Sequence, residues 1–372
     1  MSNFPLSYRL SWPLRLLKPS LAGKGGAFGP LAARWRKPHS AVRLAFLGDI
    51  SAVANSEPPE IDPALREAIA GADLVVANCE SPVVARPAFP FSTRLGLRHT
   101  MTPAFLDRVL VAAGIAPARL ALSLANNHAL DQGIAGFDET VAALADRGIT
   151  VIGTAAGGPV QGVEAGPLKL GFLAFTRWRN AAALDFAGRV VMPDTTGGWR
   201  ERAPEVDLLC AVPHWDLEFR HFPLAETRTL ARRLVREGVG LVVGGHPHVV
   251  QPVEAVDGAL IAYGLGDFLG TVASRTPWPM RLGAMLSVEV SADADSKGQV
   301  AAYRVFPFMR ERRGRHETLL PIERSEGPGA GKVKGRLAAI FADRATKVST
   351  AARSQAGARD RSGGGHSTPE TE

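Results

Sequence analysis

Cysteine and long apolar runs are both scarce in this sequence. Its 372 residues include only two cysteines, Cys79 and Cys210, and both lie in apolar stretches. So few cysteines exclude the disulfide framework of small secreted proteins. No stretch reaches the roughly 18 consecutive apolar residues that a membrane-spanning helix requires. The sequence therefore does not predict an integral membrane protein.

Acidic residues are missing from positions 1–40, which we call the basic arm because they hold seven lysines and arginines. These seven charges account for the formal net charge of +7, since the other 36 basic residues balance the 36 acidic ones. The excess positive charge is therefore local to the arm. Nucleic acid is not an expected partner.

Pro5, Pro13 and Pro19 interrupt the basic arm and leave no room for the apolar core of a standard signal peptide. Aromatic and leucine side chains alternate with its cations, a composition that occurs where a segment rests on an anionic membrane surface. A mobile tail, or an arm packed along the domain, is the more common arrangement. We predict a cytoplasmic location, with peripheral membrane contact through residues 1–40 as the alternative.

Apolar residues make up 46% of the chain, enough to build a substantial core. Short apolar runs alternate with helix-like stretches, which predicts parallel βαβ units with helices near residues 63–70, 103–113, 134–147 and 224–237. The segments 249–256, 260–265, 282–290 and 300–308 are short, β-rich and separated by turn residues, which is typical of antiparallel strands. We predict an α/β sandwich of two mixed sheets flanked by helices, within one domain at residues 41–324. Residues 325–372 are expected to form a largely disordered tail with one short helix within 333–348.

Polar side chains with metal-binding chemistry follow five of the predicted strands. In chain order, the strands end in Asp49, in Glu80, in Asn127 and His128, in His214, and in His246 and His248. Taken singly, each residue has an ordinary explanation, such as a helix cap, a solvated charge or a turn. Their shared position favours a site, because open α/β sheets assemble sites where their strands end. The mixture of carboxylate, amide and imidazole suits Mn, Fe or Zn.

The order and spacing of these motifs resemble the bacterial capsule-synthesis protein family called CapA, which is associated with poly-γ-glutamate capsules. That family looks like a branch of the calcineurin-like metallophosphoesterase superfamily, so the resemblance implies a metallophosphoesterase-like fold. It spans roughly residues 44–308 and is carried by Leu47-Gly48-Asp49, Ala77-Asn78-Cys79-Glu80, Ser123 to His128 followed by Asp131 and Gly133, His214-Trp215, Gly245 to Val249 with Gln251, and Tyr263 to Phe268.

The resemblance implies a site for two divalent metal ions. Six side chains would hold them: Asp49 and His248 the first ion, Glu80 both ions, and Asn127, His214 and His246 the second. His128 would be the acid near the leaving group, and Asp131 is counted with it as a catalytic candidate. Two cations about 3.5 to 4 Å apart hold a phosphate ester and neutralise its developing charge. An imidazole then protonates the departing alkoxide.

Three positions depart from the family pattern. Ser51 stands where the superfamily usually has a histidine, which predicts a weak first metal site. Asp216 and Asp267 stand where the capsule family often has glycine and asparagine. A carboxylate at the site would alter its metal preference or the charge of substrate that it tolerates, but a surface position is the default expectation for both. The basic run at residues 310–315 is expected to be a charged surface as well.

Three functions are compatible with this sequence. The leading hypothesis is hydrolysis of a phosphate ester, or a related bond, in an envelope polymer or its precursor. The alternative is a non-catalytic, metal-dependent binding or assembly factor for an anionic capsular polymer such as poly-γ-glutamate. Amide-bond chemistry on a glutamyl polymer would use the same site. Fold-level analogy does not choose among them. His128 separates the hydrolase from the binding factor, because catalysis requires an acid and metal binding does not.

Overall fold

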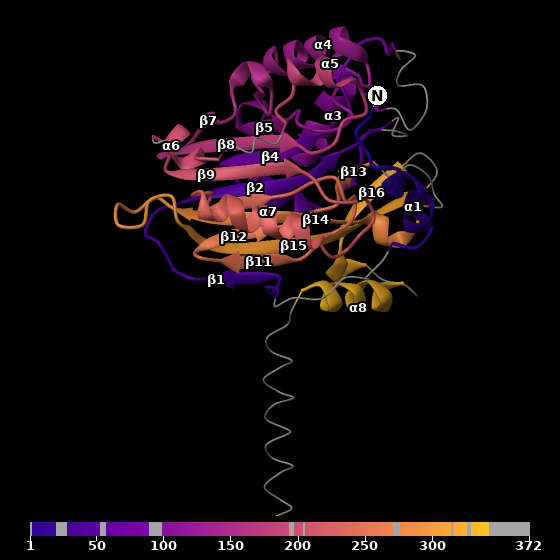
Figure 1. Ribbon diagram of the computed structural model, residues 1–372. Coiled ribbons are helices and arrows are strands. Elements are labelled where there is room, and N and C mark those ends of the chain that lie inside the picture. Colours follow the sequence, from indigo (N-terminus) through magenta and orange to yellow (C-terminus); the bar gives the residue numbers. More distant parts are fainter. Residues whose placement is uncertain are drawn as a thin grey trace, which may run out of the picture.

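The computed structural model describes residues 2–19, 28–52, 57–88, 99–192, 197–203, 205–270, 276–313, 316–325 and 329–341. Two mixed β-sheets form the centre of the molecule, and helices lie on their outer sides (Figure 1). One large apolar cluster contains buried side chains from both sheets, so the two sheets share a core. The predicted two-sheet α/β architecture is confirmed.

The first sheet has ten strands, and one side of it is parallel. The parallel strands lie in the order β2 (Ala41–Ile50), β4 (Leu74–Cys79), β5 (Leu120–Ser123) and β6 (Thr150–Ile152). On the other side of β2 come the antiparallel strands β14 (Leu282–Ser291), β15 (Val300–Arg313) and β16 (His316–Pro321). Three short strands complete the sheet: β1 (Ala32–Arg34), β3 (Glu60–Ile61) and β13 (Asp267–Leu269).

The second sheet has six strands and has a parallel centre. Its order is β11 (Val253–Val256), β12 (Ala259–Ala262), β10 (Leu241–Val243), β9 (Leu208–His214), β8 (Leu168–Thr176) and β7 (Gln161–Ala165). The four inner strands are mutually parallel, and both edge strands are antiparallel. The prediction of antiparallel strands after residue 249 is confirmed for β11, β14 and β15, whereas β12 pairs antiparallel with β11 but parallel with β10.

The helices connect the parallel strands, and four of them match predicted ranges. These are α2 (Pro63–Ala70), α3 (Pro103–Ala113), α4 (Gly133–Ala145) and α7 (Ala225–Arg236), with the shorter α5 (Ala183–Ala187) and α6 (Trp199–Arg202) between them. Local sequence explains α3 well. The Thr102 hydroxyl accepts a hydrogen bond from the amide of Phe105 at the start, and Gly114 takes a left-handed φ of 70° at the end.

Part of the predicted C-terminal tail is folded. Its helix, α8 (Ala330–Ile340), buries Val333, Leu337 and Ile340 in the main core. The short helix predicted within residues 333–348 is thus present, and it begins at Ala330. Residues 326–328 and 342–372 lie outside the described part of the chain.

The basic arm packs along the domain where it is described, which was one of the two common arrangements. Helix α1 (Leu6–Leu17) lies at one side of the molecule (Figure 1). Phe28 is buried, and β1 pairs with β15. None of the helices in the described ranges is long and apolar enough to cross a membrane.

Candidate metal centre

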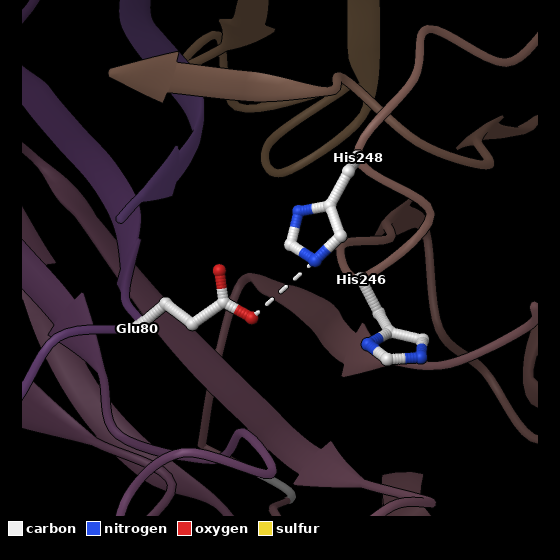
Figure 2. Close-up of side chains that lie close together, drawn as sticks. All are labelled: Glu80, His246 and His248. Atoms are coloured by element: carbon white, nitrogen blue, oxygen red, sulfur yellow. Dashed lines mark ion pairs between the residues drawn. The ribbon is translucent and has the colours of Figure 1, made fainter. Parts of the chain in front are cut away.

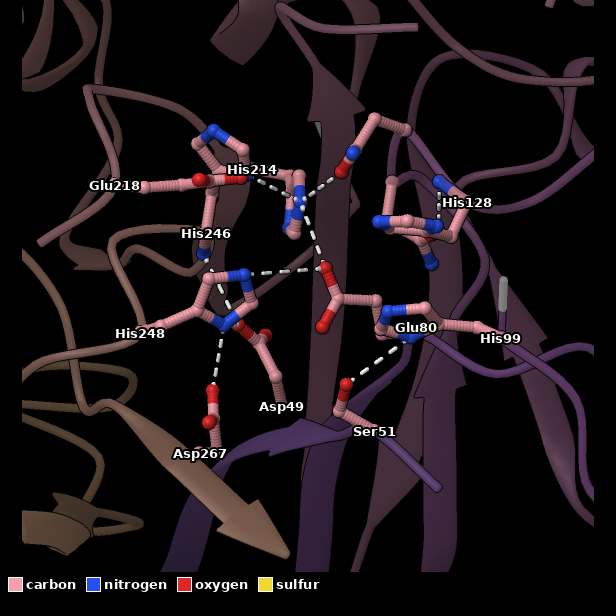
Figure 3. Close-up of polar contacts among 12 residues, drawn as sticks. Asp49, Ser51, Glu80, His99, His128, His214, Glu218, His246, His248 and Asp267 are labelled. Carbon is pink, nitrogen blue, oxygen red and sulfur yellow. Dashed lines mark hydrogen bonds and ion pairs between the residues drawn. The ribbon is translucent and has the colours of Figure 1, made fainter. Parts of the chain in front are cut away.

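The residues predicted at strand ends meet where the parallel strands of the two sheets terminate. The first sheet contributes Asp49 at the end of β2, Glu80 just after β4, and Asn127 and His128 after β5; the second contributes His214 at the end of β9, and His246 and His248 after β10. All of them are buried except for His248, which is partly exposed. In Figure 3 the side chains of Asp49, Glu80, His214, His246 and His248 point toward one another.

Three overlapping groups of side chains could each hold a metal ion. They are Glu80 with His246 and His248, Asp49 with Glu80 and His214, and Asp49 with His248 and Asp267. Within each group the ligand atoms lie within 4.8 Å of one another, and Figure 2 shows the first group. The Asn127 amide oxygen lies 2.8 Å from His214 Nε2, at the side of the second group. The structure thus brings all six predicted ligands together.

Glu80 is the side chain that best fits a bound cation. Its side chain is 0% exposed, and neither carboxylate oxygen has a hydrogen-bond partner. The nearby imidazole nitrogens lie farther than a hydrogen bond, at 3.6 Å for His214 Nε2 and 3.8 Å for His248 Nε2, both measured to Oε1. Burial raises the pKa of Glu80 to about 8, against the opposing attraction of His248. A buried carboxylate without partners is costly unless a cation compensates it.

Asp49 is anchored from two directions. Its Oδ1 accepts a hydrogen bond from Asn78 Nδ2 at 2.8 Å, and its Oδ2 accepts one from the backbone amide of His246 at 3.2 Å. Burial raises the pKa of Asp49 to about 6. The close approach depends on Gly245, because a Cβ there would lie 2.9 Å from Asp49 Oδ1. The loop after β10 is thereby held against the end of β2.

His214 and His246 form the neutral part of the cluster. Burial lowers the pKa of both rings well below the ordinary histidine value. His246 Nδ1 lies 3.1 Å from His214 Nε2, while His246 Nε2 lies 3.1 Å from the Tyr8 hydroxyl. That oxygen also accepts the amide of Glu218 at 3.4 Å. A ring that donates from Nε2 to Tyr8 keeps the lone pair of Nδ1 directed at the cluster.

His248 belongs to a charged chain that reaches into the first sheet. Its Nδ1 lies 2.6 Å from Asp267 Oδ1, and Arg310 Nη2 donates to Asp267 Oδ2 at 3.0 Å. Burial opposes protonation of His248, but the Asp267 and Glu80 carboxylates raise its pKa well above the ordinary value. A histidine whose Nδ1 bonds a carboxylate presents Nε2 to a metal.

The surface positions expected for Asp267, Asp216 and, within the run at residues 310–315, Arg310 are wrong, because all three side chains are buried. Asp267 is 7% exposed because β13 pairs with β2 and sets it opposite Asp49. Arg310 is 1% exposed and neutralises Asp267. Asp216 is 1% exposed and accepts hydrogen bonds from the amides of Leu217 and Leu224 and from Gln251.

His128 sits in a separate hydrogen-bonded unit beside the cluster. Its Nδ1 lies 2.7 Å from Asp131 Oδ2, which also accepts the backbone amide of His99 at 3.0 Å. Burial alone would lower the pKa of His128, but the Asp131 carboxylate outweighs it, and the pKa is raised. The His99 ring stacks on His128 with centroids 3.7 Å apart, and His99 Nδ1 lies 3.0 Å from Ser51 Oγ.

His99 was missed in the sequence because it follows no strand and belongs to no recognised motif. It lies three residues before the Thr102 cap of α3. Its place beside Ser51 means that an imidazole does lie next to the position where the superfamily usually has a histidine. The one hint in the sequence was Ser51, because a serine at a position where a histidine is usual suggests that another imidazole lies nearby.

The loops around the cluster hold unusual backbone conformations. Among the described non-glycine residues, five have positive φ, and four of these are Asp216 (66°), Phe219 (64°), His246 (90°) and His248 (53°). Such conformations cost on the order of 1–3 kcal/mol each and tend to gather at functional sites. The loop after β10, which carries His246 and His248, and the loop after β9 are therefore both held in strained conformations beside the cluster.

The fold and the cluster together define a two-sheet α/β protein with a candidate metal centre between the strand ends of its sheets. The family model described as bacterial capsule synthesis protein PGA_cap matches residues 43–271. The chain belongs to this family, and the resemblance seen in the sequence is confirmed.

Known relatives share the central part of the chain. The PGA biosynthesis protein CapA of Bacillus subtilis is 28% identical over 165 residues, which are 40% of this chain and 42% of that protein. The capsule biosynthesis protein CapA of Bacillus anthracis is 29% identical over 163 residues, 40% of this chain and 39% of that one. A probable polyglutamine synthesis accessory protein of Mycobacterium tuberculosis is 28% identical over 217 residues, covering 52% and 55%. The chain thus spans about half or less of these relatives.

Among solved structures, the chain is similar to the calcineurin-like phosphoesterase YfkN of Bacillus subtilis. The identity is 13% and the TM-score 0.41, over 80% of this chain and 97% of that one. A phosphatase of Mycoplasma pneumoniae matches at 12% identity with a TM-score of 0.35, over 73% of this chain and 95% of that one.

Proposed function

We propose that the protein is a metal-dependent hydrolase that cleaves a phosphate ester, or a related bond, in an envelope polymer or its precursor. The observation that carries this proposal is Glu80, a fully buried carboxylate among histidines and a second carboxylate, with neither of its oxygens hydrogen-bonded. The names of the relatives support a role in making a poly-glutamate capsule. The proposed partner is accordingly an anionic phosphoester or poly-γ-glutamate-type substrate.

Two divalent ions, Mn, Fe or Zn, fit the donor set. Six side chains would hold them: Asp49, Glu80, Asn127, His214, His246 and His248. When bound, such ions polarise a phosphoryl group, activate water at neutral pH and neutralise developing charge. The protein orients the donors, because Tyr8 and Asp267 occupy the second ring nitrogens of His246 and His248.

His128 is the proposed general acid. It lies outside the three groups of candidate ligands, and Asp131 holds its Nδ1. The Asp131 carboxylate raises the pKa of His128, so the ring keeps a proton to higher pH than an ordinary histidine. Its remaining nitrogen, Nε2, is the one available to donate that proton to a leaving alkoxide.

The packing of the basic arm favours a second candidate, a non-catalytic metal-dependent binding or assembly factor for an anionic capsular polymer. The Phe4 ring lies 6.0 Å from the His246 ring and 5.0 Å from that of Trp178, and the Tyr8 hydroxyl contacts His246. These aromatic groups cover one wall of the cluster. Binding through a metal is compatible with such a cover, whereas turnover does not require it.

Metal content is the first test of the site. The purified chain, loaded with Mn, Fe or Zn, should hold about two ions by elemental analysis, because the ligand set divides between two centres. His214→Ala should lower this occupancy. One tightly bound ion would support a weak first site at Ser51, and no ion at any metal concentration would remove the basis of both candidate functions.

A comparison of two substrates then separates enzyme from binder. His128→Ala should keep its metal and hydrolyse an alkyl phosphate ester about 100 to 10,000-fold more slowly, the usual contribution of a general acid. A nitrophenyl ester, whose leaving group scarcely needs a proton, should be affected less. His214→Ala should damage both rates together. If His128→Ala matches the parent on both esters, His128 is not the acid and the assembly factor is the better description.

A further inference from the structure

Helix α1 has one face packed over the candidate site. The Tyr8 hydroxyl contacts His246 Nε2 at 3.1 Å, and the Trp12 indole donates a hydrogen bond to Glu218. The Trp12 ring packs 5.7 Å from Phe219, centroid to centroid, in a small apolar cluster that Leu16 joins. The helix is thereby fixed to the loops that carry the histidines of the second sheet.

The opposite face of α1 is apolar and has no partner within the described chain. Its four leucines are between 70% and 75% exposed: Leu6, Leu10, Leu14 and Leu17. At 100° per residue these positions fall within an arc of about 80°. They account for four of the eight exposed large apolar side chains in the described ranges, so they form a continuous stripe and are not scattered residues.

Cations flank this leucine stripe. Arg9 and Lys18 are exposed beside and just beyond it, and residues 1–40 contain no acidic residue. A second copy of the helix packed on the stripe would bring like charges together. The anionic headgroups of a phospholipid bilayer would instead meet the cations while the leucines enter the acyl boundary. The charges therefore favour lipid over a second copy as the occupant.

We propose that α1 docks on the surface of an anionic phospholipid bilayer through its leucine stripe, while Tyr8 and Trp12 keep their contacts with the site. Docking in this way places the candidate metal centre directly beside the membrane. The proposal deepens the proposed function in one respect, since a substrate of that centre would be an anionic polymer or precursor held at the bilayer. The docking itself does not depend on metal or turnover.

Vesicle binding by the full chain tests the proposal. Leu10→Gln/Leu14→Gln removes two leucines but keeps helix propensity, because glutamine and leucine are comparable in helices. Its matched control is Val111→Gln/Leu184→Gln, which removes apolar side chains that are 73% and 88% exposed on α3 and α5. On vesicles of phosphatidylcholine with phosphatidylglycerol, the α1 variant should bind about tenfold or more weakly than the parent. The control should bind like the parent.

A second variant tests the electrostatic half of the proposal. Arg9→Gln/Lys18→Gln should bind the same vesicles more weakly and with a smaller dependence on salt, since screening acts on the charges it lacks. The parent should bind vesicles of phosphatidylcholine alone much more weakly than the anionic ones. Thermal unfolding of all three variants should match the parent, because these side chains are exposed.

Two outcomes would overturn the docking proposal. One is equal vesicle binding by the parent and Leu10→Gln/Leu14→Gln. The other is a dimer of the parent in sedimentation that becomes monomeric in this variant while vesicle binding stays the same, which would make a second copy the occupant. Because no metal or substrate is present in these assays, neither outcome bears on the hydrolase.

Discussion

At the scale of single residues, the candidate site is organised by where charge is buried. Arg310 compensates Asp267 directly, whereas neither oxygen of Glu80 accepts a hydrogen bond and the nearest basic groups are the imidazoles of His214 and His248, at 3.6 and 3.8 Å. The protein thus supplies a permanent counter-charge for Asp267. It leaves Glu80 available to a cation that can bind and dissociate. This asymmetry identifies Glu80 as the residue around which cations would gather.

Asp131 provides a prediction at this scale. Replacing it with Asn removes the charge that raises the pKa of His128 but keeps an oxygen able to accept the Nδ1 proton. We expect hydrolysis of a poor-leaving-group ester to slow by about 100-fold, the lower end of a general acid's contribution, with metal content unchanged. The control is Asp138→Asn, which alters an exposed carboxylate on α4. Parent-like turnover by Asp131→Asn would remove Asp131 from the catalytic unit.

Site residues that directly follow a strand could be predicted from the sequence. Those brought to the site by contacts between segments far apart in the chain could not. Asp49, Glu80 and His214 were predictable because an apolar run that ends in a polar ligand is a local pattern. Asp267 was not, because its burial depends on a parallel pairing between β13 and β2, far apart in the chain. His99 reaches the site by stacking on His128, and no motif or spacing in the sequence indicates that contact.

At the scale of elements, the site depends on how closely β13 approaches β2. Gly48 lies in β2, and a Cβ there would be 1.8 Å from the backbone oxygen of Gly266. The two segments therefore approach each other so closely that only glycine fits at position 48. This contact keeps Asp267 beside Asp49 and fixes the base of the cluster.

Gly48→Ala should accordingly lower the free energy of unfolding by about 1–3 kcal/mol or more, since backbone has to move to relieve the overlap. Denaturant titration with a fluorescence readout measures it. Gly162→Ala is the matched control, because Gly162 also lies in a strand, β7, and a Cβ there meets nothing within 4 Å. Similar losses for both variants would show that the approach of β13 to β2 is not what limits Gly48.

At the scale of the whole molecule, the candidate ligands come from two sheets that share one core. Asp49 and Glu80 belong to the first sheet, and His214, His246 and His248 to the second. An ion bound to both sets of donors would be bound by the native arrangement and not by the unfolded chain. Binding and stability are then linked.

Metal should therefore stabilise the protein against unfolding. At a free metal concentration 100 times Kd, the expected gain in the free energy of unfolding is about 2.7 kcal/mol for one site. Differential scanning calorimetry with and without Mn, and after addition of a chelator, measures this gain. It should be reduced in His214→Ala and retained in His316→Ala, which removes an exposed imidazole on β16. A gain of equal size in both variants would place the bound metal elsewhere.

The division of donors between two sheets also makes the centre a reporter of assembly. A chain in which only the first sheet has formed offers carboxylates and an amide, and one in which only the second has formed offers imidazoles. Either partial set is a poorer match for Mn, Fe or Zn than the complete mixture. Tight metal binding would then identify molecules in which both sheets have formed and packed correctly. A single measurement of metal content would distinguish native protein from misfolded chains of the same mass.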